Sequence, residues 1–138
     1  YQNSALLKPR LIIFQSQKSL EMYRDALVQI EQAANEANRK LNNFGTGHLI
    51  FTRVDDNYET ALETATLSLS KRYAMDFRRA AERYAALGNP EDVAAKIIEF
   101  HEVGVRHIII DLVGPYENRF QQIERFSAEV MPLLAALR

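Results

Sequence analysis

Three short, mainly apolar runs in the chain have the pattern of buried β-strands: Leu11–Phe14, His48–Val54 and Arg106–Leu112. Runs of this kind suit strands that are covered on both faces, as in a parallel sheet. Between and after them, apolar residues recur every three or four positions, which is the spacing of an amphipathic helix. This spacing predicts helices over residues 20–41, 58–73, 77–87, 90–103 and 120–134, so the expected order is β-α-β-α-α-α-β-α.

Residues that favour helix ends support these boundaries. Ser19 precedes the first helix and Asp76 precedes the third, and both are residue types that cap helix N-termini. Asn89-Pro90 is the clearest start signal, because Asn caps well and proline suits the first helical position. Gly104 closes the helix that follows, and Pro132 is expected to start, kink or shorten the final turn of the last helix.

Strands that alternate with helices pair in parallel through right-handed crossovers. A sheet of only three parallel strands leaves both of its edge strands uncovered. The sequence therefore predicts an α/β fold in which residues 1–138 form a single, partial domain. We expect the open edges to be covered by the missing part of a larger fold or by a second copy of the chain in a homo-oligomer.

Composition excludes several classes of function. The chain carries 17 Lys and Arg against 18 Asp and Glu, and this net charge of -1 argues against nucleic acid or an anionic membrane as a partner. The absence of cysteine excludes disulfides and thiolate chemistry. The three histidines are far apart, so no metal site is predicted. No apolar run approaches the roughly 20 residues of a membrane span, and no signal-peptide pattern opens the chain, so a cytoplasmic protein is expected.

Candidate ligand-binding residues follow the predicted strands, because parallel α/β folds bind ligands at the carboxyl ends of their strands. Gln15 and Ser16 follow the first strand, Arg53 closes the second, and Gly114 follows the third. An arginine beside a hydroxyl suits a phosphate or carboxylate. The competing interpretation of Arg53 is a surface ion pair with the Asp55-Asp56 sequence beside the next helix cap.

Two further features each have a structural and a functional interpretation. Asp111 ends the third strand, where it either binds a ligand or a proton or shapes the Val113–Pro115 turn. Tyr73 and Phe77 flank a predicted helix break, where they either line a pocket or belong to the core. In both cases the structural interpretation is favoured.

The segment from Tyr84 to Asp111 resembles the C-terminal region of the luciferase-like flavin-dependent monooxygenases. The resemblance is carried by an ordered set of motifs. These are a strand ending in V-D-D, an R-Y-x-x-D-F segment, a G-x-P-E-D-V helix start, a V-G-V bend and an acidic helix with a V-x-P-x-L pattern, which here are Phe51–Asp56, Arg72–Phe77, Gly88–Val93, Val103–Val105 and Glu124–Leu134.

This resemblance implies the last β/α units of a TIM barrel, about three strands with their helices in an incomplete barrel. It further implies a flavin-dependent oxidoreductase or monooxygenase that acts on a small organic substrate with FMN or, alternatively, a deazaflavin, F420. The chain has no Trp and shows Phe14-Gln15-Ser16 where the family often ends a strand in Asp-Gly-Trp, so no catalytic residue is assigned. Gln15, Ser16, Arg53 and Gly114 are cofactor-binding candidates by strand-end position.

Two other functions remain open. The chain could be a non-catalytic half-barrel, a structural or binding subunit that needs a partner chain and holds no cofactor. A phosphoacceptor module is the third interpretation, because Asp111 is followed four residues later by Pro115. That interpretation is disfavoured, since Gln15-Ser16 stands where an acidic pair is needed and only one helix follows Asp111.

Overall fold

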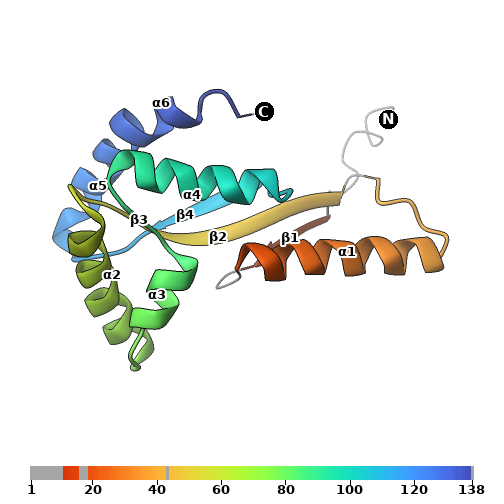
Figure 1. Cartoon of the computed structure of the whole chain (residues 1–138), viewed down its shortest axis with the longest axis horizontal. Helices are drawn as coiled ribbons and strands as arrows, with labels where there is room; N and C mark the ends of the chain where they lie inside the picture. The colour runs from red at the N-terminus through yellow and green to blue at the C-terminus, as the bar shows by residue number, and fades with distance from the viewer. Residues whose placement is uncertain (1–10, 16–18, 43, 138) are drawn as a thin grey trace, which may run out of the picture.

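The computed structural model describes residues 11–15, 19–42 and 44–137 as a parallel sheet with helices on both faces (Figure 1). The central strand is β2, and the last helix is divided by a π-helical turn over Phe126–Val130. The elements are β1 (Leu11–Gln15), α1 (Leu20–Glu36), β2 (Phe44–Val54), α2 (Tyr58–Tyr73), α3 (Arg78–Tyr84), β3 (Ala86–Gly88), α4 (Pro90–Glu102), β4 (His107–Leu112), α5 (Arg119–Arg125) and α6 (Met131–Leu134).

The register fixes which strands share an edge of β2. Gly47 is opposite both Phe14 of β1 and His107 of β4, so β1 and β4 lie on opposite sides. Thr52 is likewise opposite residues of both β3 and β4, so β3 lies on the same side as β1. Within the described ranges the outer edges of β1 and β4 have no strand partner. The sheet is therefore not closed into a barrel.

The three strands expected from the sequence are present, and a fourth was missed. Residues 77–87 were predicted as one helix, but α3 ends at Tyr84 and Ala86–Gly88 pairs with the end of β2. Backbone pairing with a distant strand outweighs the helical pattern here. The predicted helix over 20–41 ends at Glu36 because Asn38 takes a positive φ of 55°.

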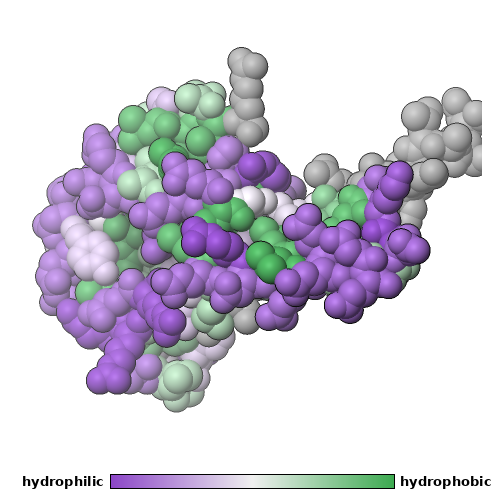
Figure 2. Space-filling model, turned by 45° about the vertical axis from the view of Figure 1, so that its right-hand side comes forward, coloured by the Kyte–Doolittle hydropathy of each residue, from purple (hydrophilic) through white to green (hydrophobic). Residues whose placement is uncertain are grey.

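Two hydrophobic cores lie on opposite faces of the sheet because side chains alternate along β2. Ile50 and Val54 point into a first core with α1 and α4, and Phe51 points into a second core with α2 and α3. His48, which the sequence placed at the start of its strand, is fully buried in the middle of β2, because β2 begins at Phe44. On the face shown in Figure 2, hydrophobic side chains also reach the surface between polar ones.

The return from the α2–α3 pair to the sheet is closed by backbone hydrogen bonding. The Asp55 N–H donates to the Gly88 carbonyl across 2.8 Å, and Val54 and Gly88 are opposite each other in the register. The chain therefore leaves β2 and comes back to it at neighbouring points.

The start of α4 follows the sequence prediction. Asn89 is the N-cap, its side chain accepts from the Asp92 N–H at 2.8 Å, and the Asp92 carboxylate accepts from the Asn89 N–H in return. Pro90 occupies the first turn. This reciprocal capping satisfies two N–H groups that have no partner inside the helix.

Asn89→Ala is expected to lower the free energy of unfolding by about 1 kcal/mol, because the cap is lost. Urea unfolding followed by circular dichroism measures the change. Asn42→Ala, at an exposed asparagine outside the helices, is the control and is expected to stay within about 0.5 kcal/mol of the wild type. An equal loss in the two variants would contradict the capping role.

Tyr23 connects α1 to the sheet and has a pH-sensitive side chain. Its hydroxyl donates to the Gly47 carbonyl at 3.1 Å, and its ring meets those of His48 and Phe100 edge to face. Burial raises the pKa of Tyr23, because the folded state disfavours the phenolate. The stability that comes from this neutral hydroxyl is complete below the unfolded-state pKa of about 10 and is lost as the pH rises through the higher folded pKa.

We therefore expect the wild-type protein to lose stability above about pH 10, and Tyr23→Phe to lose less over the same interval. Below that pH, Tyr23→Phe is expected to cost about 1–3 kcal/mol, because the buried Gly47 carbonyl loses its donor. Urea unfolding at a pH on each side of 10 tests both effects. Tyr116→Phe, at an exposed tyrosine, is the control and should leave the pH profile unchanged.

Candidate functional site

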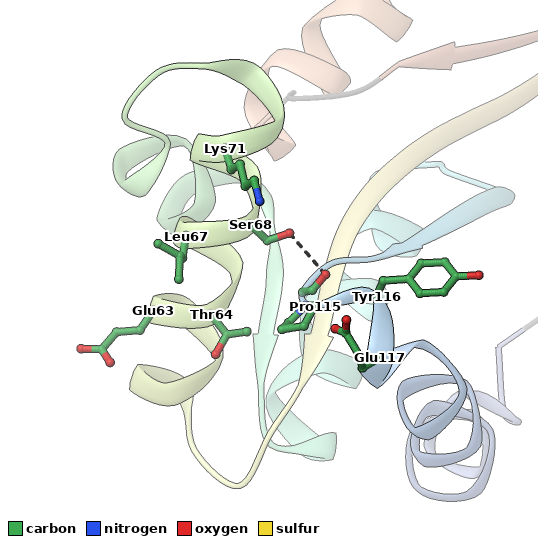
Figure 3. Close-up of a pocket in the computed structure, with 9 residues that line it drawn as sticks. Glu63, Thr64, Leu67, Ser68, Lys71, Pro115, Tyr116 and Glu117 are labelled. Atoms are coloured by element: carbon green, nitrogen blue, oxygen red, sulfur yellow. Dashed lines mark hydrogen bonds between the residues drawn. The ribbon is translucent and has the colours of Figure 1, made fainter.

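A pocket of about 700 Å³ lies between α2 and the loop that follows β4 (Figure 3). One wall is a face of α2 and the other is the loop that begins at Gly114, so the pocket lies at the carboxyl end of β4. Its volume is in the range of sites for small organic molecules and cofactors. It is lined by Glu63, Thr64, Leu67, Ser68, Lys71, Gly114, Pro115, Tyr116 and Glu117.

The α2 wall is polar because α2 buries only one of its faces. Asn57 caps the helix by accepting from the Thr60 N–H at 2.9 Å. Figure 3 shows Thr64, Ser68 and Lys71 pointing toward the loop. These side chains recur every three or four residues beside the buried positions, so the wall offers two hydroxyls and one ammonium.

The loop wall is held against α2 and the sheet. The buried Val113 donates its N–H to the Thr52 carbonyl at 3.0 Å, and the Ser68 hydroxyl donates to the Gly114 carbonyl at 3.5 Å. Gly114 has a φ of 135°, which only glycine adopts without strain. Tyr116 is 73% exposed and lies beneath the Arg119 guanidinium, 4.7 Å from ring centre to Cζ.

Arg53 lies behind the loop wall and is only 7% exposed. Its Nε donates to Asp55 Oδ2 at 2.7 Å, and its Nη2 lies 3.5 Å from Asp55 Oδ1 and 3.4 Å from Asn118 Oδ1. Its Nη1 donates to the Val113 carbonyl at 3.3 Å. The ion pair suggested by the sequence is therefore present, but it is buried rather than on the surface.

Gln122 of α5 closes the carboxyl end of β2. Its amide donates to the Val54 carbonyl at 2.8 Å and accepts from the Val54 N–H at 3.0 Å, so one buried side chain satisfies both backbone groups at the end of β2. The sequence analysis did not single out Gln122. No local signal identifies it, because the bonds join residues that are far apart in the sequence.

The structure brings together two of the four predicted site residues. Arg53 lies against the backbone at Gly114, which lines the pocket. Gln15 is the last residue of β1 and is opposite His48 of β2. His48 lies about 16 Å along β2 from Arg53, at roughly 3.3 Å per residue. β1 pairs with the first half of β2, so its carboxyl end does not reach the edge formed by β2 and β4. Ser16 lies outside the described residues.

Asp111 accepts from Arg72 Nη1 at 2.8 Å, in an ion pair that is partly exposed. This hydrogen bond to Asp111 raises the pKa of Arg72 further above its usual value.

Phe77 is 2% exposed and stacks on Tyr73 at 5.0 Å, with Phe51 close by, so it belongs to the second core. Neither aromatic residue lines the pocket.

Among the residues that the structure describes, no group of three or more His, Asp or Glu side chains is arranged to hold a metal ion. No helix in this part of the chain is long and apolar enough to cross a membrane.

Comparisons with known proteins place this geometry in context. No protein-family model matches the chain. The F420-dependent glucose-6-phosphate dehydrogenase 2 of Rhodococcus jostii is 26% identical over 142 residues, which cover 88% of this chain. The chain spans 42% of the length of the curated relatives it matches.

Solved structures show the same fold. An F420-dependent secondary alcohol dehydrogenase in complex with an F420-acetone adduct matches 88% of this chain and 42% of its own, with a TM-score of 0.67 and 18% identity. The oxygenating constituent of 3,6-diketocamphane monooxygenase from Pseudomonas putida, in complex with FMN, matches 89% of this chain and 42% of its own, with a TM-score of 0.55 and 16% identity.

These comparisons confirm two expectations from the sequence. The relatives and structural neighbours are luciferase-like proteins that depend on F420 or FMN, as the motifs suggested. The fold is an α/β arrangement with an open parallel sheet that matches fragments of luciferase-like TIM-barrel proteins.

Proposed function

We propose that this chain supplies the carboxyl-terminal β/α units of a luciferase-like oxidoreductase that uses F420 or FMN on a small organic substrate. The sequence likeness to an F420-dependent dehydrogenase, extending over 88% of the chain, carries the proposal. Both curated relatives are F420-dependent, which favours F420 over FMN. A single, partial barrel domain over residues 1–138 is part of the proposal, and so is a cytoplasmic location, with which the absence of cysteine is compatible.

The residues of the pocket fit a hydroxyl-rich cofactor or substrate that carries its anionic group near Lys71, because Glu63 and Glu117 add two carboxylates that accept hydrogen bonds from ligand hydroxyls. Lys71 supplies a positive charge, Thr64 and Ser68 supply hydroxyls, and the loop approaches closely at Gly114 because this residue has no side chain. Both curated relatives act, by their names, on glucose 6-phosphate, a substrate with both chemical features. In this proposal Lys71 holds the anion and the Thr64 hydroxyl donates to it, while Ser68, whose proton goes to the Gly114 carbonyl, accepts from a ligand hydroxyl.

When bound, F420 supplies hydride transfer, whereas reduced FMN supplies reaction with O₂. The chain's own part is to bind and orient one end of the ligand. The loop from Pro115 to Glu117 and the α2 wall are the two sides that contact this end.

The test is a binding measurement on the protein as it exists, purified with any polypeptide that accompanies it. F420 and FMN are titrated separately and followed by their absorbance and fluorescence. We expect one of the two cofactors to bind to the wild type. We expect the same cofactor to bind at least about tenfold more weakly to Lys71→Met, since charge-assisted hydrogen bonds are lost. Lys40→Met, outside the pocket, is the control. Absence of binding by both cofactors would overturn the proposal.

A second candidate function is the half-barrel that acts as a non-catalytic structural or binding subunit. The open edge of β4 favours it, because residues 109–112 of β4 line a cavity of about 390 Å³ together with Leu49 of β2 and Ile123 of α5. Ile109 is 40% exposed and Phe120, on the neighbouring helix, is 76% exposed. In this candidate a second copy or the missing part of the barrel covers these side chains.

The native mass of the purified protein separates the two candidates. A stable assembly of this chain that binds neither cofactor supports the half-barrel subunit. A cofactor-binding species that contains the remaining length of the relatives supports the oxidoreductase.

A further inference from the structure

One side chain contacts the base of both walls of the pocket. Arg53 donates to Asp55, which lies two residues before the N-cap of α2, and so connects to the start of the α2 wall. It also donates to the Val113 carbonyl and to Asn118 Oδ1, which lie just before and just after the loop wall. The guanidinium therefore bridges the two segments whose separation sets the width of the pocket.

The backbone of the loop at Gly114 lies directly against the guanidinium of Arg53, which is possible because Gly114 has no side chain. A Cβ atom added at Gly114 would collide with Nη1 of Arg53, so the loop backbone rests directly on the guanidinium. The planar arginine fork makes these bonds in fixed directions, whereas a lysine ammonium has a different shape and reach. All three nitrogens of the guanidinium donate to protein oxygens: the two carboxylate oxygens of Asp55, the Val113 carbonyl and the Asn118 side chain.

We infer that Arg53 is a positioning residue for this pocket: it sets the distance between α2 and the Gly114–Glu117 loop, and the ligand does not contact it. This inference rests on the proposed function for the identity of the ligand. It revises the expectation that Arg53 binds the cofactor anion directly. Lys71, which projects from the α2 wall, is the cation available to that anion.

Arg53→Lys tests the inference, because it keeps the charge and removes the fork. Two measurements are made on the protein as it exists: hydrogen–deuterium exchange over residues 113–118, and affinity for F420 and for FMN. We expect faster exchange in this segment. We also expect affinity that is about tenfold to a hundredfold weaker, because the walls of the pocket are no longer held in place. Arg125→Lys, at an arginine ion-paired to Asp56 and Glu129, is the matched control and is expected to change neither.

A second variant covers the case in which lysine is not tolerated. Arg53→Met with Asp55→Asn removes both charges, so no unpaired carboxylate is left buried. Positioning predicts that Arg53→Lys binds as weakly as this double variant. If lysine instead restores the affinity of the wild type, Arg53 acts by its charge and the inference is wrong.

The failure of the proposed function is distinguishable from the failure of this inference. If the wild-type protein binds neither cofactor, the proposed function fails, and the exchange measurement still decides whether Arg53 holds the loop. If exchange over residues 113–118 is the same in Arg53→Lys and the wild type, the inference is overturned whatever the cofactor.

Discussion

Phe100→Ala is expected to lower the free energy of unfolding by about 3–5 kcal/mol, the cost of removing a large aromatic ring from a well-packed core. Phe100 is 1% exposed. Its ring stacks on that of His48 at 4.3 Å between centres and meets Tyr23 edge to face at 6.5 Å. The substitution therefore opens a cavity where α1, β2 and α4 meet. Urea unfolding with a fitted m-value measures the loss.

Phe120→Ala is the matched control for this prediction. Phe120 is 76% exposed, so its removal is expected to change stability by no more than about 0.5 kcal/mol. If both variants lost the same amount, the first core would not depend on Phe100 in the way that its contacts indicate.

Gly114→Ala is expected to have the second largest effect. A φ of 135° strains any residue with a Cβ, at about 1–3 kcal/mol. Overpacking against Arg53 adds about 1–3 kcal/mol. The variant should therefore unfold at lower urea, and it should also lose affinity for the ligand of the pocket.

Gly104→Ala separates the two contributions. Gly104 has a φ of 113°, but a Cβ there would meet only the end of the Leu27 side chain, at 3.0 Å. Its loss of stability reports mainly the backbone strain. We expect Gly114→Ala to be the more destabilising variant, and Gly114→Ala combined with Arg53→Met and Asp55→Asn to show less than additive losses. Equal losses at the two glycines would contradict the close approach of Arg53.

Local sequence patterns predicted much of the fold. Ser19 and Asn89 each cap the helix expected after them, because their effect depends only on the next three residues. Pro132 lies in the first turn of the last helical segment as expected. The π-helical turn before it was not predicted, although proline offers no N–H to the carbonyl four residues earlier.

Features that depend on long-range pairing were not predictable. β3 is three residues long and is stabilised by its hydrogen bonds to β2, so no local pattern marks it. The same applies to the register of β1, which separates Gln15 from Arg53. Arg53 and Gly114 were predicted from their strand-end positions, but the network around Arg53 joins residues up to 65 positions apart.

The hydrogen bond from Asp55 to Gly88 has a consequence for the diversification of this scaffold. The chain leaves β2 before α2 and returns beside the end of β2 through β3, so α2 and α3 together form a segment, here called the cassette, that is inserted between two neighbouring points of the sheet. Its exposed positions, which include the pocket wall, can vary through evolution or by design as long as the buried residues of α2 and α3 that pack on Phe51 are kept. One wall of the pocket belongs to that cassette, whereas Arg53 and the opposite wall do not. The residues of the α2 wall can therefore change while Arg53 and the opposite wall, which lie outside the cassette, stay the same.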